Sequence, residues 1–207
     1  MMSNTLPTVC IVDDDTAIQM ALLFLLKSEE IPAIAYSSAQ EFLEKMPKTK
    51  IGALILDVRM PGMSGLELQQ QLQLQNSHIP IIFLTGHSDI PMAVQAMKYG
   101  AIEFYEKPFK NESLLVSIRR CFEIEQQHDQ NQANDKHAQQ LVSQLTAREH
   151  EIMNVLVTGN TNKEIARELN ISPRTVEVHR ANIMRKLEAN NLSDLVRLAL
   201  RASPELL

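Results

Sequence analysis

Short apolar runs alternate with helical patterns five times over the first 122 residues, and this alternation restricts the fold more than any other feature. The runs are rich in aliphatic and β-branched residues, as is typical of strands buried on both faces. Each run is followed by a stretch with apolar residues at helical spacing. The alternation predicts an α/β fold, a doubly wound five-stranded parallel sheet with helices on both faces. The expected strands are 8–12, 33–36, 53–56, 79–84 and 102–105.

Polar residues stand at the ends of four of these runs. Asp13 and Asp14 follow the first run, Asp57 the third, Thr85 the fourth and Lys107 the fifth. Because the carboxyl ends of parallel strands meet at one edge of the sheet, we expect these side chains to lie together. Three carboxylates repel one another unless a cation is present, and hard oxygen ligands suit Mg²⁺. A carboxylate beside Mg²⁺ can attack a phosphoryl group and form an aspartyl phosphate, with Lys107 neutralising the developing charge.

Each of these residues also has an ordinary structural interpretation. Asp57 is compatible with a turn or helix-capping aspartate, Thr85 with a strand-end turn residue, and Lys107 with a surface lysine. An enzymatic alternative is an aspartyl-phosphate phosphatase, which places a second aspartate two residues after its nucleophile as the general acid. Arg59 occupies that position here, which argues against a dedicated enzyme.

The composition changes sharply at residue 123. Residues 123–144 are rich in Gln, Asn, His and charged side chains, with few apolar residues before Leu141. This segment either extends the preceding helix or forms a solvated linker, and in both cases it separates two domains. We therefore expect a first domain at 7–122, a polar linker at 123–144 and a second domain at 145–207.

The second domain has helical patterning throughout. Thr146 and Glu149 form the sequence signature of a capping box that opens its first helix. Two further helices, 162–169 and 174–187, are joined by a short connection, which is typical of a helix-turn-helix. Basic residues gather between Lys163 and Lys186 although the chain carries a net charge of −5. This local excess favours double-stranded DNA as a partner, and a solvated helix face is the alternative.

The overall composition fits a globular chain of 207 residues, 44% hydrophobic and 22% charged. The two cysteines show no metal or disulfide spacing, which favours a reducing, cytoplasmic setting. The N-terminus lacks the pattern of a signal peptide. The longest apolar run is far shorter than the ~20 residues of a membrane span, so no membrane partner is expected.

Residues 7–122 resemble the receiver domains of two-component response regulators. The motifs that carry the resemblance are Asp13-Asp14, Asp57 with Met60-Pro61-Gly62-Met63-Ser64-Gly65, Thr85 and Lys107-Pro108-Phe109. The resemblance implies that Asp57 accepts phosphate from a sensor histidine kinase. It implies a cis Lys107–Pro108 bond and a switch made by Thr85 and Phe104. The implied Mg²⁺ ligands are Asp13, Asp14, Asp57 and the backbone carbonyl of Arg59.

Residues 145–207 are similar to the LuxR/NarL-type DNA-binding domains, FixJ branch. The matching motifs are Leu145-Thr146-Ala147-Arg148-Glu149, Asn162-Lys163-Glu164-Ile165-Ala166 and Thr175-Val176-Glu177-Val178-His179-Arg180. In this motif the recognition helix faces the base edges. The residues expected there are Arg174, Glu177, Val178 and Ala181, and those expected on phosphates are Lys163, Thr175, His179, Arg180 and Lys186. The last helix, 192–202, is the expected dimer face, with core packing as the alternative.

Together these features predict a transcription regulator switched by phosphorylation of Asp57, which forms a homodimer and binds two DNA half-sites. The FixJ resemblance favours activation through RNA polymerase. The alternative is a phosphorylation-independent DNA-binding regulator with a vestigial receiver.

Overall fold

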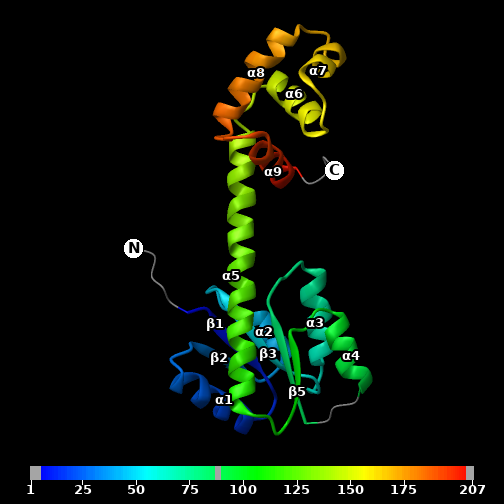
Figure 1. The fold of residues 1–207 in the computed structure, drawn as a ribbon. Coiled ribbons are helices and arrows are strands. Elements are labelled where there is room, and N and C mark those ends of the chain that lie inside the picture. The colour runs from blue at the N-terminus through cyan, green and yellow to red at the C-terminus, as the bar shows by residue number, and fades with distance from the viewer. Residues whose placement is uncertain (1–5, 87–89, 204–207) are drawn as a thin grey trace. The chain divides into compact units, whose positions relative to one another are not determined.

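The structure is a computed structural model, and it describes residues 6–86 and 90–203 (Figure 1). The chain divides into two compact units, Met1–Gln127 and His128–Leu207. No helix in the described ranges is both long enough and apolar enough to cross a membrane.

The first unit contains a five-stranded parallel sheet with the strand order β2-β1-β3-β4-β5, which confirms the predicted fold class. The strands are β1 (Thr8–Val12), β2 (Ala33–Tyr36), β3 (Ile51–Asp57), β4 (Ile81–Thr85) and β5 (Glu103–Glu106). The helices are α1 (Thr16–Ser28), α2 (Ala39–Lys45), α3 (Gly65–Leu74), α4 (Ile90–Lys98) and α5 (Asn111–Val142).

Alternate residues of the strands build two apolar layers, one on each face of the sheet. Val9 and Ile11 of β1 pack with side chains of α1 and α5. Cys10 and Val12 point to the other face and pack with side chains of α2, α3 and α4. This alternation follows from the two-residue period of a strand, and it leaves the strand ends free to form a site.

The element bounds differ from the sequence prediction in two informative places. β4 begins at Ile81 rather than at residue 79, because Pro80 has no N–H to donate to a ladder. α5 continues through the polar segment to Val142, so that segment is helical. Leu141 and Val142 at its end are buried in the core of the second unit.

The second unit consists of the end of α5 and four further helices. These are α6 (Ala147–Val157), α7 (Asn162–Glu168), α8 (Pro173–Lys186) and α9 (Leu192–Ala202). Thr146 and Glu149 form the predicted capping box, and Ser172 caps α8 with Pro173 at its first position. Asn191 caps α9, because its side chain accepts the Asp194 N–H at 2.9 Å.

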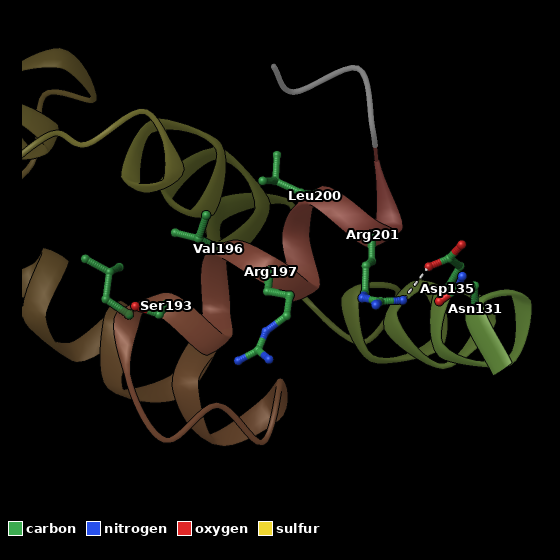
Figure 2. Close-up of a pocket in the computed structure, with 8 residues that line it drawn as sticks. Asn131, Asp135, Ser193, Val196, Arg197, Leu200 and Arg201 are labelled. Atoms are coloured by element: carbon green, nitrogen blue, oxygen red, sulfur yellow. Dashed lines mark hydrogen bonds and ion pairs between the residues drawn. The ribbon is translucent and has the colours of Figure 1, made fainter. Parts of the chain in front are cut away.

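The predicted dimer face on α9 divides into a core side and a groove side. Leu195 and Ala199 are fully buried in the unit's core. Val196 instead lines an open groove of ≈ 820 Å³ between α9 and the end of α5, together with Leu192 and Leu200. Figure 2 shows Arg201 extending from α9 toward Asp135 of α5, with which it forms a 3.0 Å ion pair.

Candidate functional site

The polar strand ends of the first unit converge on one pocket at the carboxyl edge of the sheet. Asp13 follows β1, Asp57 ends β3 and Thr85 ends β4, and all three are buried. Asp14 is exposed at the rim. One carboxylate oxygen from each of Asp13, Asp14 and Asp57 lies within 4.8 Å of the others.

Lys107 reaches into this pocket from the end of β5. Its Nζ lies 2.6 Å from Asp13 Oδ2 and 3.6 Å from Asp57 Oδ1. One ammonium group thus faces several carboxylates, so the pocket is short of positive charge. The pKa of Asp57 is raised to about 6, chiefly by burial and also by nearby Asp13 and Asp14, while Lys107 and the Val58 N–H oppose the rise. A hard divalent cation fits a pocket of this charge and these oxygen donors.

The Asp57 side chain is held by the turn that follows β3. The Val58 N–H donates a 2.9 Å hydrogen bond to Asp57 Oδ1, and the Gly65 N–H donates to the Val58 carbonyl. A Cβ atom at position 65 would lie 2.1 Å from the Asp57 carbonyl oxygen. Position 65 therefore requires glycine, a role that its place in the sequence motif does not by itself reveal.

The remaining predicted residues of this unit lie on or beside the same strands. The Lys107 N–H donates to the Thr85 carbonyl at 2.7 Å, and the Lys107–Pro108 bond is cis. Phe104 lies on β5 beside Phe83, with ring centroids 6.1 Å apart. Arg59 is exposed, and its guanidinium lies 3.9 Å from Met92 Sδ on α4.

Asp15, which directly follows Asp13 and Asp14 in the sequence, has a structural role that was not predicted from the sequence. Asp15 caps α1, because its side chain accepts the Ala17 N–H at 2.8 Å. An aspartate just before an apolar helical pattern is the signal that identifies such a cap. Asp15 is therefore a useful control for the roles of its neighbours.

The helix-turn-helix of the second unit is formed by α7 and α8. Val176 and Ile183 of α8 are fully buried and define its core side. Two of the basic residues expected on phosphates make contacts within the unit. Lys186 Nζ bonds to Glu149 Oε2 at 2.7 Å, and the Arg180 guanidinium bonds to Asn162 at the start of α7.

The outer side of α8 carries all four of the residues expected on base edges. Arg174, Glu177, Val178 and Ala181 are all exposed, and Arg174 pairs with Glu177 at 3.1 Å. Arg185 is also exposed on this helix and was missed by the sequence analysis. Arg185 could have been found from its spacing to Arg174. Eleven residues correspond to about three helical turns, so the two arginines lie on the same side of the helix.

Comparisons with known proteins agree on both units. Residues 9–119 match the family of the response regulator receiver domain, and residues 143–199 match the luxR family of bacterial regulatory proteins. The chain belongs to the FixJ-like response regulators. It is 43% identical to the transcriptional regulatory protein FixJ of Bradyrhizobium diazoefficiens over 94% of this chain and 95% of that protein.

Other response regulators show the same likeness over nearly the full length. The response regulator protein TodT of Pseudomonas putida is 42% identical over 99% of this chain and 90% of that protein. Among solved structures, the response regulator StyR is 44% identical with a TM-score of 0.78, covering 93% of this chain and 98% of StyR. Full-length FixJ from B. japonicum is 42% identical with a TM-score of 0.59, covering 97% and 99%. This response regulator thus combines a receiver with a LuxR-type DNA-binding domain, and it is a transcription regulator.

The close contact at Gly65 gives a test of how the receiver positions Asp57. We expect Gly65→Ala to lower the free energy of unfolding of the first unit by about 3 kcal/mol, because the new Cβ must displace the Asp57 backbone. Helix propensity alone would predict stabilisation, because alanine is a better helix former than glycine and Gly65 is the first residue of α3. The three tyrosines, Tyr36, Tyr99 and Tyr105, all lie in the first unit, so tyrosine fluorescence in urea measures its unfolding.

Gly86→Ala provides the matched control for this substitution. A Cβ at position 86 meets nothing within 4 Å, so the tyrosine transition should move little. An unchanged transition in Gly65→Ala would show that the turn after β3 relaxes without cost, and it would contradict the tight packing against Asp57.

Proposed function

We propose that Asp57 accepts a phosphoryl group from a sensor histidine kinase. The observation that carries this proposal is the Lys107 ammonium group, which lies 3.6 Å from a buried Asp57 oxygen beside two further carboxylates. In the transfer, an Asp57 carboxylate oxygen forms the new bond to phosphorus while the phosphorus–nitrogen bond of the donor histidine breaks. Lys107 neutralises charge on the phosphoryl oxygens, and the Thr85 hydroxyl donates a hydrogen bond to one of them.

We propose that the same pocket holds Mg²⁺. The residues that would hold it are Asp13, Asp14, Asp57 and the backbone carbonyl of Arg59. The ion would supply positive charge that the single ammonium group of Lys107 does not provide. The grouping of the three carboxylate oxygens supports this assignment.

The metal assignment is tested by replacing the exposed acid at the pocket rim. We expect Asp14→Asn to weaken Mg²⁺ binding at least about tenfold, since a neutral amide is a poorer ligand for this ion than a carboxylate. The measurement is calorimetric titration of the full-length protein with Mg²⁺ in the absence of any phosphodonor. Asp15→Asn is the control, because Asn retains the capping role of Asp15 and should leave the affinity within about twofold. Equal affinities in both variants would remove Asp14 from the ligand set.

We propose that phosphorylation favours a homodimer that binds two half-sites on double-stranded DNA. Thr85 and Phe104 would transmit the change, because they lie on β4 and β5 next to the pocket. Shifting the ratio of the active to the inactive receiver conformation from 1:99 to 99:1 requires about 5.5 kcal/mol of differential stabilisation. A phosphoryl group brings a charge of about −1.5 to −2 beside Lys107, which is an interaction of suitable strength.

The DNA contacts divide into those that specify sequence and those that position the domain. We assign Arg174, Glu177, Val178 and Ala181 to the base edges, since they are exposed on the outer side of α8. We assign Lys163, Thr175 and His179 to phosphates. Arg180 and Lys186 support the fold as well as the interface, because both make side-chain bonds within the domain.

The direction of regulation follows from the FixJ likeness alone. We propose activation of transcription in the cytoplasm through RNA polymerase, and transcription from a bound promoter in a purified system tests it. Reduced transcript in the presence of the phosphorylated protein would instead identify a repressor.

A further inference from the structure

We propose that Gln19 is a positioning residue for the Mg²⁺ ligands Asp13 and Asp14, because it holds the backbone that carries them. This inference rests on the proposed magnesium site and deepens it. Gln19 lies on α1 one helical turn after the Asp15 cap, and it belongs to none of the motifs that carry the receiver resemblance.

The side chain of Gln19 joins the connection after β1 to the end of β2. Its Nε2 donates a 2.6 Å hydrogen bond to the Asp13 carbonyl and a 3.1 Å hydrogen bond to the Tyr36 carbonyl. Both partners are acceptors, so the amide must present its NH₂ group to them. Side chains of an α-helix lean toward its N-terminus. From its place one turn after the cap, Gln19 therefore reaches back to the connection that precedes α1.

The end of β2 is a firm anchor for these hydrogen bonds. Tyr36 is buried, pairs with Val12 in the parallel ladder, and packs edge-to-face against Phe42 with ring centroids 5.3 Å apart. Its carbonyl also accepts the Asp13 N–H at 3.2 Å. Both backbone polar groups of Asp13 are therefore tied to β2, directly through the N–H and through Gln19 at the carbonyl.

The connection held in this way carries two of the proposed Mg²⁺ ligands. It contains only residues 13–15, so its backbone determines where the carboxylates of Asp13 and Asp14 stand. The Asp13 side chain is oriented as well, since the Asp15 N–H donates to Oδ1 at 2.9 Å and Lys107 donates to Oδ2 at 2.6 Å. Gln19 adds the backbone restraint to this side-chain restraint.

The chemistry of the ion makes this restraint important for binding. Mg²⁺ requires near-ideal octahedral geometry, so it binds only those conformers in which the ligand oxygens converge. If the released connection adopts that arrangement about a tenth of the time, the apparent affinity falls about tenfold. Losing a partner that orients a metal ligand typically costs about tenfold to a hundredfold in affinity. Because Gln19 bonds to the backbone of a ligand residue and not to its carboxylate, we expect the lower end of that range.

Gln19→Met tests the inference, because methionine is similar in length to glutamine and has no N–H donor. We expect it to weaken Mg²⁺ binding about tenfold in calorimetric titration of the full-length protein without a phosphodonor. The Mg²⁺ concentration that gives half-maximal phosphorylation of Asp57 by acetyl phosphate should rise by the same factor. The rate at saturating Mg²⁺ should stay within about twofold of the wild type, because Gln19 bonds to the carbonyls of Asp13 and Tyr36.

Gln19→Asn is a second variant that keeps the amide group. Its side chain is shorter by one methylene, about 1.5 Å, so its amide cannot bridge the same two carbonyls. We expect a loss of Mg²⁺ affinity similar to that in Gln19→Met. Tyrosine fluorescence in urea shows whether the first unit is folded in each variant.

Gln69→Met is the matched control. Gln69 of α3 is buried, and its Nε2 likewise bridges two backbone carbonyls, those of Ala96 and Tyr99, at 3.1 Å each. These carbonyls lie at the end of α4, where the chain returns to the start of β5 at the edge of the sheet opposite the pocket. The control thus removes the same pair of hydrogen bonds from the same unit. Its Mg²⁺ affinity should stay within about twofold of the wild type.

The outcomes separate this inference from the magnesium site on which it rests. If folded Gln19→Met and Gln19→Asn bind Mg²⁺ as the wild type does, the positioning role is wrong and the magnesium site stands. Equal weakening in Gln69→Met would attribute the effect to general loosening of the unit, and loss of folding in both Gln19 variants would make the residue purely structural. Either result overturns the inference. If the wild type binds no Mg²⁺, the proposed site and this inference both fail.

Discussion

Asp57→Asn is expected to abolish the response of the protein to a phosphodonor. With Mg²⁺ and acetyl phosphate, the wild-type solution mass should rise from 23.4 kDa toward twice that value, and DNA affinity should rise at least about tenfold. The amide of asparagine is not a nucleophile toward phosphorus, so the variant should show neither change. Light scattering after size exclusion measures the mass, and titration of a labelled duplex selected by the wild type measures the affinity.

Asp15→Asn is the matched control for this experiment, since Asp15 is adjacent in sequence to Asp14 but caps α1 and faces no phosphoryl group in our proposal. It should respond to acetyl phosphate as the wild type does. If the wild type binds DNA equally well without the donor, the receiver does not gate binding, and the phosphorylation-independent regulator becomes the better description. If Asp57→Asn still dimerises with the donor, the phosphoacceptor is a different residue.

The phosphoacceptor pocket was predictable from the sequence because its residues stand at strand ends. Asp13, Asp57, Thr85 and Lys107 each follow an apolar run, and the parallel sheet brings such ends together whatever the strand order. Contacts between side chains far apart in the chain were not predictable in the same way. Lys186 was expected on DNA phosphate, and no local pattern connects it to Glu149, which is 37 residues away.

The polar segment after residue 123 shows a different limit of sequence reasoning. Its residues have no continuous apolar stripe, so periodicity cannot distinguish a helix from a solvated linker. The helix instead reflects burial of Leu141 and Val142 in the core of the second unit. Tertiary packing of this kind stabilises a helix whose own propensity is weak.

The ion pair between Glu149 and Lys186 connects α6 and α8 within the DNA-binding domain. Glu149 is buried at the start of α6, where Thr146 donates to its carboxylate, and Lys186 at the end of α8 donates to it at 2.7 Å. Burial alone would raise the pKa of Glu149, but the hydrogen bonds from Lys186 and Thr146 prevail and lower it to about 2. The carboxylate is therefore charged in the folded domain at every pH at which the protein is expected to be folded.

Lys186→Met is expected to lower the free energy of unfolding of the second unit by about 2 kcal/mol at pH 7. The substitution leaves Glu149 charged and buried without its cation. The expected loss of stability is smaller than the roughly 3–5 kcal/mol for breaking a fully buried ion pair, because the Lys186 side chain is 24% exposed. Circular dichroism follows the helices of both units, whereas tyrosine fluorescence follows the first unit alone. The dichroism transition should thus move to lower urea while the fluorescence transition stays in place.

The pH dependence of the stability of the second unit tests the contribution of Glu149 to the same ion pair. Because the folded pKa of about 2 lies below the ordinary value of 4.5, the carboxylate contributes stability above about pH 4.5, and this contribution is lost as the pH falls toward 2. Glu149→Gln should therefore destabilise the second unit most at pH 7 and progressively less below pH 4.5. Arg185→Met removes a neighbouring exposed charge and should leave the dichroism transition unchanged. A shift of equal size in Arg185→Met and Lys186→Met would mean that net charge, and not the buried pair, determines the stability of this domain.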